Sequence, residues 1–251
     1  MSKAFIVTGA SRGLGLAIAQ ILLGESHKVF LVARSEDELR GLKAEHGDSV
    51  DYMTADLADF KVVPKIVAAA VKAFSKIDGL VVNHGTLSPI TKICDSNAEE
   101  WRQCYDINVF SAVALAQASI PELRKSNGRI VFVSSGASGH VYVGWGAYGT
   151  SKAALNHICA HLAEEEPSIT AVAISPGKVD TPMQKLIREE GHNGMTPDEH
   201  AKFVSEHETG RLLRPDQPGT VIAKLAISAT SSLTGKHFNW NAPELADFQS
   251  K

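Results

Sequence analysis

A tyrosine and a lysine four residues apart are the side chains of this sequence best suited to acid–base chemistry. They are Tyr148 and Lys152, in the run Tyr-Gly-Thr-Ser-Lys. If 147–166 forms a helix, as its apolar spacing predicts, both side chains lie on one face and reach one ligand. A nearby ammonium ion favours a phenolate, so the pKa of Tyr148, ordinarily about 10, is expected to fall toward neutrality. Such a phenol can give a proton to an alkoxide. The alternative is an ordinary helix start, with Tyr148 packed and Lys152 in solvent.

Alternating strand-length and helix-length segments predict the scaffold that positions these two residues. Short apolar runs are typical of buried strands, and the longer segments between them have helical periodicity. This alternation indicates βαβ units and a parallel sheet. We therefore expect a single α/β domain over 1–251, with a Rossmann-type doubly wound sheet of about seven parallel strands and helices on both faces. The predicted strands are 4–8, 28–32, 50–54, 79–83, 129–133, 169–175 and 236–240, and the predicted helices are 13–24, 36–46, 59–76, 97–125, 147–166 and 216–229.

The segment 181–215 interrupts this alternation. It is rich in charged residues and is punctuated by glycine and proline, which are typical of turns and loops. It follows a predicted strand at the end where α/β sheets bind ligands. We expect a substrate lid there, and a solvated surface excursion is the alternative.

A glycine-rich turn follows the first predicted strand. Its spacing is Gly-x3-Gly-x-Gly, at Gly9, Gly13 and Gly15, and a helical pattern begins at once. A strand, a glycine turn and a helix N-terminus together present free backbone N–H groups and the positive end of a helix dipole to an anion. The lysine of a P-loop is absent, which argues against a nucleoside triphosphate. The turn therefore predicts a binding site for the pyrophosphate of a dinucleotide.

Two arginines near this turn indicate which dinucleotide binds. Arg12 lies at the predicted helix N-terminus, where a cation is unfavourable unless an anion lies beside it. Arg34 and Ser35 follow the second predicted strand, whose tip meets the adenosine ribose in such sheets. A basic residue at that tip accommodates the 2′-phosphate of NADP. We expect NADP(H) rather than NAD(H); the alternative is two surface arginines without a ligand.

With these motifs in place, the chain resembles the short-chain dehydrogenase/reductase family over essentially its whole length. The glycine turn and several widely spaced motifs match the family. His84 departs from the family's usual Asn-Ala-Gly; we expect it to be a hydrogen-bonded structural residue, with contact to the cofactor or substrate as the alternative. The resemblance implies a cofactor site made by Gly9, Ser11, Arg12, Gly13, Leu14, Gly15, Arg34, Ser35, Asp56, Leu57, Asn83, His84, Gly85, Tyr148, Lys152, Pro176, Gly177, Val179 and Thr181.

The resemblance also implies a catalytic set of four residues. Ser135, chosen because it lies 13 residues before Tyr148, would hydrogen-bond the substrate carbonyl. Tyr148 would donate the proton, and Lys152 would hold the nicotinamide ribose and ease ionisation of Tyr148. Asn108 would keep a water in the helix near 97–125 and connect Lys152 to solvent. The cofactor would provide the hydride.

Within the family, three runs look like the fungal and bacterial benzil reductase group, which is itself similar to sepiapterin reductases. This resemblance implies reduction of one carbonyl of a small dicarbonyl substrate by NADPH. It also implies a homodimer or homotetramer formed through helices 97–125 and 147–166. The runs are 134–138, 144–149 and 179–184. The substrate contacts are expected at Ser135, Tyr142, Trp145 and Met183, in an apolar wall with Leu87, Val143 and Leu186, although such residues are often plain core.

The composition excludes several other classes of protein. The chain is 44% hydrophobic and 21% charged with a net charge of −3, so neither a nucleic acid nor a membrane is an expected partner. The three cysteines form no Cys-x-x-Cys pattern, which favours a reducing compartment. No targeting leader or membrane-length apolar run appears, so we expect a cytoplasmic protein. His157 and His161 lack a third ligand, and no metal site is expected.

Three alternative functions can be compared with this interpretation. A serine hydrolase is disfavoured because Ser135 is not in a Gly-x-Ser-x-Gly elbow. A sugar-nucleotide epimerase is disfavoured by the chain length and the glycine spacing. An NADP(H)-binding redox sensor or regulatory protein with little turnover stays open, and the complete set of four catalytic residues argues against it.

Overall fold

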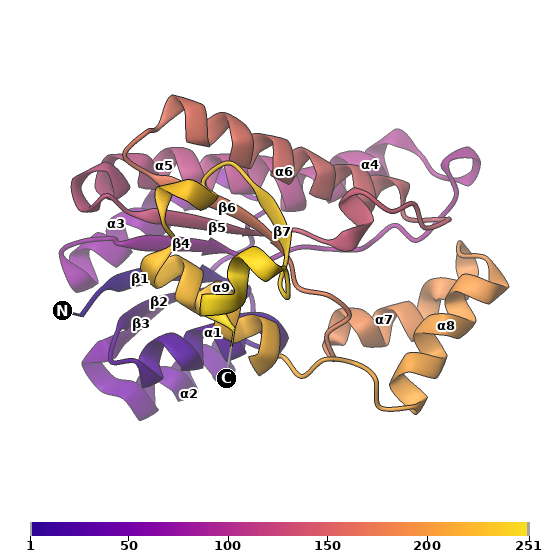
Figure 1. The fold of residues 1–251 in the computed structure, drawn as a ribbon, viewed down its shortest axis with the longest axis horizontal. Coiled ribbons are helices and arrows are strands. Elements are labelled where there is room, and N and C mark those ends of the chain that lie inside the picture. The colour runs from indigo at the N-terminus through magenta and orange to yellow at the C-terminus, as the bar shows by residue number, and fades with distance from the viewer. Residues whose placement is uncertain (1, 250–251) are drawn as a thin grey trace.

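Seven parallel strands form one sheet at the centre of the molecule (Figure 1). The computed structural model describes residues 2–249. The strands lie in the order β3-β2-β1-β4-β5-β6-β7, which confirms the predicted doubly wound parallel sheet. Their bounds are β1 (Ala4–Thr8), β2 (Lys28–Ala33), β3 (Val50–Thr54), β4 (Gly79–Val82), β5 (Arg129–Val133), β6 (Thr170–Ser175) and β7 (His237–Asn239).

Helices cover both faces of the sheet because successive strand residues point to opposite sides. In β5, for example, Val131 and Val133 join one core cluster, and Ile130 and Phe132 join the other. One face is covered by α1 (Gly13–Gly24), α2 (Glu36–His46) and α9 (Asp216–Ser228), and the other by α3 (Val63–Phe74), α5 (Ser111–Ser126) and α6 (Gly146–Glu165).

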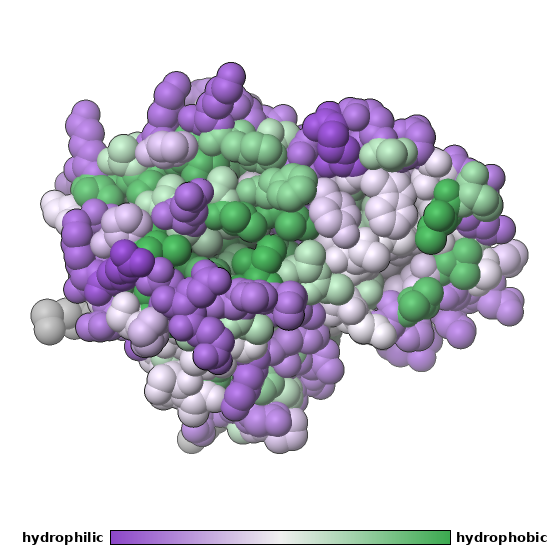
Figure 2. All heavy atoms as spheres, turned by 90° about the horizontal axis from the view of Figure 1, so that it is seen from above, coloured by the Kyte–Doolittle hydropathy of each residue, from purple (hydrophilic) through white to green (hydrophobic). Residues whose placement is uncertain are grey.

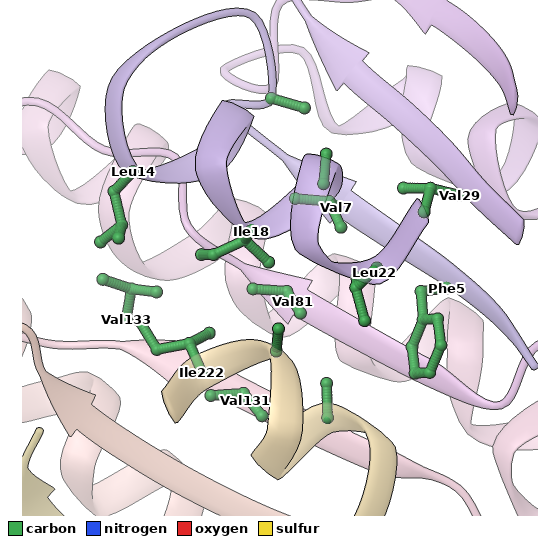
Figure 3. Packing of buried hydrophobic residues seen from close by; sticks show 14 of the residues in the cluster. Phe5, Val7, Leu14, Ile18, Leu22, Val29, Val81, Val131, Val133 and Ile222 are labelled. Atoms are coloured by element: carbon green, nitrogen blue, oxygen red, sulfur yellow. The ribbon is translucent and has the colours of Figure 1, made fainter. Parts of the chain in front are cut away.

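The core between α1 and the sheet shows how helical spacing in the sequence places side chains for packing. Ile18 and Leu22 lie four residues apart on α1 and are fully buried, so they project from one face of that helix. Figure 3 shows Ile18 near Val81 of the sheet and Ile222 of α9, and Leu22 near Phe5 of β1. Each such side chain contributes about 1.5–3 kcal/mol by leaving water. This packing fixes the N-terminal end of α1 against the carboxyl end of β1.

Two predicted helices differ from the observed ones. The segment predicted as one helix over 97–125 is α4 (Ala98–Tyr105), a π-helical turn (Asp106–Phe110) and α5. The segment predicted over 59–76 begins as a 3-10 turn, and α3 starts at Val63. Proline is accepted in a first helical turn because it has no N–H to leave unpaired, and Pro64 fixes that start.

The strand order reverses beside β1, and this places the site. The chain runs from β1 outward to β3 and then returns to β4 on the other side of β1. Crevices outside the carboxyl ends of the strands at such a switch point bind ligands in open α/β sheets. The glycine turn after β1 and the Asn83–Gly85 segment after β4 both lie there.

The segment 181–215 forms two helices that extend beside the sheet (Figure 1). They are α7 (Pro182–Glu190) and α8 (Pro197–Glu208). The base of the segment is closed where the Asp180 N–H donates to the Leu213 carbonyl at 2.8 Å. Across residues 2–249, every helix is too short or too polar to cross a lipid bilayer.

Candidate active site

The glycine turn forms a tight cradle at the start of α1. Gly9 and Gly13 have φ values of +65° and +55°, which side chains with a Cβ rarely adopt. Arg12 precedes the helix in extended conformation and makes no side-chain cap, so the first N–H groups of α1 are open to an anion. Ser11 and Leu14 are buried beneath the turn. This backbone fits the pyrophosphate of a dinucleotide.

The tip of β2 lies next to the glycine turn. The Ala10 N–H donates to the Val32 carbonyl at 3.3 Å, and Arg34 and Ser35 follow in exposed positions. Within residues 2–249 neither Arg12 nor Arg34 forms an ion pair. Two unpaired guanidinium groups beside an anion cradle are suited to a further phosphate.

The remaining predicted cofactor segments meet the same edge. Asp56 is exposed after β3, and its Oδ1 accepts the Ala58 N–H at 3.0 Å; Leu57 is buried. On the other side of the turn, a Cβ added to Gly13 would lie 3.2 Å from Cγ2 of Thr181. The glycine turn and the segment of Pro176, Gly177, Val179 and Thr181 are therefore neighbours.

Tyr148 and Lys152 lie on one buried face of α6, as their spacing predicts. They are 6% and 3% exposed, and Lys152 Nζ lies 5.7 Å from the centre of the Tyr148 ring. Nζ also donates to the Val133 carbonyl at 2.9 Å, at the end of β5. Ser135 follows that strand, and its Oγ accepts the Ala137 N–H at 3.2 Å. One strand end and one helix therefore place a serine, a phenol and an amine together.

The sequence predicted a lowered pKa for Tyr148, and this prediction is wrong. Burial raises the pKa of Tyr148 to about 12, and a hydrogen bond with Ser135 opposes this rise only in part. The same burial lowers the pKa of Lys152 to about 8. Removal from water disfavours both charged forms, and here it outweighs their proximity. Tyr148 therefore keeps its proton at neutral pH, which suits a group that donates one.

Asn108 lies in the π-helical turn, and its amide is held from two sides. Oδ1 accepts the Thr86 N–H at 2.8 Å, and Nδ2 donates to the Thr86 carbonyl at 2.8 Å and to Ser151 Oγ at 3.0 Å. A Cβ on Gly85 would lie 3.1 Å from Oδ1 and 3.4 Å from Lys152 Nζ. Glycine at this position lets the loop, the asparagine and the lysine approach one another.

The Asn83–His84 pair binds the glycine turn from below. Asn83 Nδ2 donates to the carbonyls of Thr8 and Gly9, at 3.0 and 3.3 Å. The ring nitrogens of His84 contact Thr8 Oγ1 at 2.8 Å and Ser111 Oγ at 2.6 Å. His84 is therefore the hydrogen-bonded residue that we expected.

An aromatic cluster borders Tyr148. Trp145 packs edge-on to the Tyr148 ring at 5.8 Å, and Tyr142 lies 4.6 Å from Trp145. The helix α8 adds Phe203, 5.4 Å from Trp145 and 5.6 Å from Tyr142. Leu87 is buried in this cluster, and Met183 and Leu186 pack against it.

Phe203 is a residue of the site that sequence reasoning missed. It is the buried residue of α8, so one large apolar side chain in a polar helix was the available signal. Lys178 Nζ lies 4.7 Å from the centre of its ring and 2.7 Å from Glu206 Oε1. These contacts hold α8 against the aromatic cluster.

Histidines and acidic residues do not gather into a metal site within residues 2–249. His157 and His161 stack edge to face on α6, with ring centres 4.8 Å apart. They occupy exposed positions away from the buried face that carries Tyr148.

Comparisons with known proteins show which family the chain matches. A family model described as short chain dehydrogenase matches residues 3–192. A benzil reductase ((S)-benzoin forming) of Saccharomyces cerevisiae is 42% identical, over 99% of this chain and 100% of its own. A benzil reductase of the same description from Bacillus cereus is 33% identical, over 88% of this chain and 92% of its own.

Solved structures extend the likeness to the fold. A short chain dehydrogenase/reductase from Saccharomyces cerevisiae superposes with a TM-score of 0.97 at 42% identity, covering 99% of this chain and 100% of that one. A Brucella melitensis 3-ketoacyl reductase in complex with NADH and a Gluconobacter frateurii L-sorbose reductase in complex with NADPH each have a TM-score of 0.81, at 26% and 27% identity. They cover 94% and 95% of this chain, which matches 96% and 94% of theirs.

Proposed function

The chain belongs to the short-chain dehydrogenase family, and from that premise we propose that it is an NADPH-dependent reductase of ketones or diketones of the benzil type. As a family member it is an oxidoreductase that uses a nicotinamide cofactor and acts on CH–OH or C=O groups. The observation that carries the finer proposal is the meeting of Ser135, Tyr148 and Lys152 at the end of β5.

Each residue of the catalytic set has a role that its environment supports. Ser135 donates a hydrogen bond to the substrate carbonyl oxygen and stabilises the charge that develops there. Tyr148, protonated at neutral pH, transfers its proton to the oxygen as the alkoxide forms. Lys152 stabilises the resulting phenolate and holds the ribose, while Asn108 orients the loop beside it. The nicotinamide, when bound, supplies the hydride.

The preference for NADPH rests on Arg12 and Arg34. Both lie beside the glycine turn without an ion-pair partner in the described part of the chain. An arginine at the tip of β2 can bond a 2′-phosphate with two parallel N–H groups.

Loss of absorbance at 340 nm tests the proposed function. We expect the purified protein to oxidise NADPH when benzil or another diketone is added, with a higher kcat/KM than with NADH. Quinones, aldehydes and simple ketones complete the panel. NADPH binding without oxidation across the whole panel would contradict a reductase and would favour a redox sensor.

The substrate wall contains a polar atom that suits a dicarbonyl compound. Trp145 Nε1 is buried and has no hydrogen-bond acceptor within residues 2–249. A buried donor without an acceptor costs about 1–3 kcal/mol of stability. The Trp145 ring packs edge-on against the Tyr148 ring. We assign this N–H to the second carbonyl of a substrate whose first carbonyl meets Ser135 and Tyr148. Tyr142, Met183 and Phe203 would pack on the attached aryl group.

Trp145→Phe is expected to lower kcat/KM for benzil while sparing a substrate that lacks the second carbonyl. The variant keeps one aromatic ring and loses the N–H donor together with part of the indole ring, so the comparison of two substrates is needed to isolate the hydrogen bond. One hydrogen bond contributes about 1 kcal/mol, so we expect a loss of roughly fivefold. Deoxybenzoin, which has a CH₂ group in place of one carbonyl, is the matched substrate, and its kcat/KM should stay within about twofold. Equal losses for both substrates would contradict the assignment.

The apolar surface over α5 supports the proposed homodimer or homotetramer. Phe110 and Val113 are 48% and 42% exposed, and a groove between α3 and α5 is lined by apolar residues such as Val67 and Ala118. Figure 2 shows hydrophobic side chains gathered on the face seen from above, where these helices lie in Figure 1. Burying this face against a second copy would remove it from water.

The substrate lid over 181–215 is also a proposal. Its inner side joins the aromatic cluster through Phe203, Ile187 and Met195, and the Lys178–Glu206 ion pair holds it in place.

We place the protein in the cytoplasm, where reduced cysteines and NADPH are available.

A further inference from the structure

His84 connects the glycine turn to the π-helical turn that carries Asn108. Its Nδ1 lies 2.8 Å from the hydroxyl of Thr8, the last residue of β1. Its Nε2 lies 2.6 Å from the hydroxyl of Ser111, the first residue of α5. Thr8 and Ser111 are fully buried, and His84 is partly buried between them. One ring therefore spans the two segments that frame the proposed site.

The hydrogen-bond partners determine which nitrogen carries the proton. Burial and the nearby Lys152 lower the pKa of His84, so the ring is neutral and has one N–H. Ser111 Oγ donates to the Ile107 carbonyl at 2.5 Å, and so it must accept from Nε2–H. The Thr8 hydroxyl then donates to Nδ1, in preference to its longer 3.2 Å contact with the Val81 carbonyl. The hydrogen bonds run in one direction, from Thr8 through His84 and Ser111 to Ile107.

This chain of hydrogen bonds ends on the Ile107 carbonyl, which does not receive the Ser111 N–H because of the π-helical turn. The Ser111 N–H donates to the Asp106 carbonyl, five residues back, instead of to Ile107, four residues back as in an α-helix. The Ser111 hydroxyl takes that place on Ile107. A serine that bonds the carbonyl four residues back commonly distorts a helix, and here His84 fixes the hydroxyl in that orientation.

We propose that His84 is a positioning residue that, through Ser111, holds the π-helical turn open so that the Asn108 amide stays paired with Thr86 and Ser151. This proposal rests on the carbonyl reduction proposed above. Without the ring, the Ser111 hydroxyl is free to rotate away from Ile107, and the segment can relax to an α-helix. Asn108 would then turn away from Gly85 and Lys152, since one residue fewer in the turn changes the direction of its side chain.

Ser111→Ala and Ser119→Ala form a matched pair that tests the proposal. Both serines are fully buried on α5, but Ser119 Oγ has no hydrogen-bond partner in residues 2–249. We expect kcat for diketone reduction to fall roughly tenfold in Ser111→Ala and in His84→Ala, and in Ser111→Ala the Kd of NADPH should change less than about threefold. Ser119→Ala should stay within about twofold. Equal effects of the two serine variants would overturn the proposal.

A double-mutant cycle with Asn108→Ala separates positioning from general loss of packing. If His84 acts through Asn108, the double variant His84→Ala/Asn108→Ala is no slower than Asn108→Ala alone. His84→Ala and Asn108→Ala should each also shift the alkaline limb of the pH dependence of kcat. We attribute that limb to Lys152, whose pKa is about 8. Independent, multiplying losses with an unchanged pH profile would show that His84 has a different role.

Hydrogen exchange gives a readout that does not depend on turnover. In Ser111→Ala the exchange rates of the amides of 106–111 should differ from those of the wild type, because backbone hydrogen bonds to the residue four positions back would replace those of the π-helical turn; in Ser119→Ala they should not differ. If the wild-type protein reduces no carbonyl compound, the proposed function fails, whereas this exchange result still decides whether Ser111 holds the turn. Wild-type exchange rates for these amides in both variants would show that Ser111 does not hold the π-helical turn.

Discussion

Tyr148→Phe is expected to lower carbonyl reduction by a factor of roughly a thousand or more, the upper part of the range for a general acid. The substitution removes one oxygen atom from a fully packed ring, so the fold and the glycine turn should be unaffected. The Kd of NADPH, measured by fluorescence titration, should stay within about threefold of the wild-type value. The rate is best measured in a single turnover with benzil, which reports the chemical step.

Tyr105→Phe is the matched control for this variant. Tyr105 also loses only a hydroxyl group, and its ring centre lies 6.3 Å from that of Phe110. Its kcat should equal the wild-type value within error. Since burial raises the pKa of Tyr148 to about 12, the wild-type rate should show no alkaline limb from this tyrosine below that pH. Turnover that survives in Tyr148→Phe would show that another group donates the proton.

The sequence predicted those parts of the fold and site that depend on local pattern. Strand runs such as Ala4–Thr8 and Arg129–Val133 are short and largely apolar, and their predicted bounds agree with the structure. The shared face of Tyr148 and Lys152 follows from helical spacing alone. The glycine turn was identifiable because positive φ values favour glycine at Gly9 and Gly13.

The features that could not be predicted depend on contacts between distant segments. The π-helical turn inside 97–125 contacts His84 and Thr86, which lie more than twenty residues earlier in the chain. The raised pKa of Tyr148 comes from burial that only the assembled fold provides. Phe203 reaches the aromatic cluster because α8 folds back toward Trp145. Periodicity within one segment carries no information about any of these contacts.

Arg34→Asp is expected to reverse the cofactor preference. The wild-type side chain offers a cation at the tip of β2, and the substitution replaces it with a carboxylate. That carboxylate repels a 2′-phosphate and can accept a hydrogen bond from a 2′-hydroxyl. A hydrogen bond to a charged group contributes about 1.5–3 kcal/mol, so the ratio of kcat/KM for NADPH over NADH should fall by roughly 10- to 100-fold. Initial rates with benzil at matched ionic strength measure this ratio.

Arg40→Asp provides the control that separates a specific contact from the general field of the protein. It makes the same change of charge on the exposed surface of α2, but Arg40 pairs with Asp37 one turn away. A long-range electrostatic effect would change the ratio of kcat/KM for NADPH over NADH equally in both variants, and this change would become smaller with added salt. A direct contact with the 2′-phosphate predicts a large change in Arg34→Asp only. An unchanged ratio in Arg34→Asp would mean that the exposed tip of β2 does not select the cofactor.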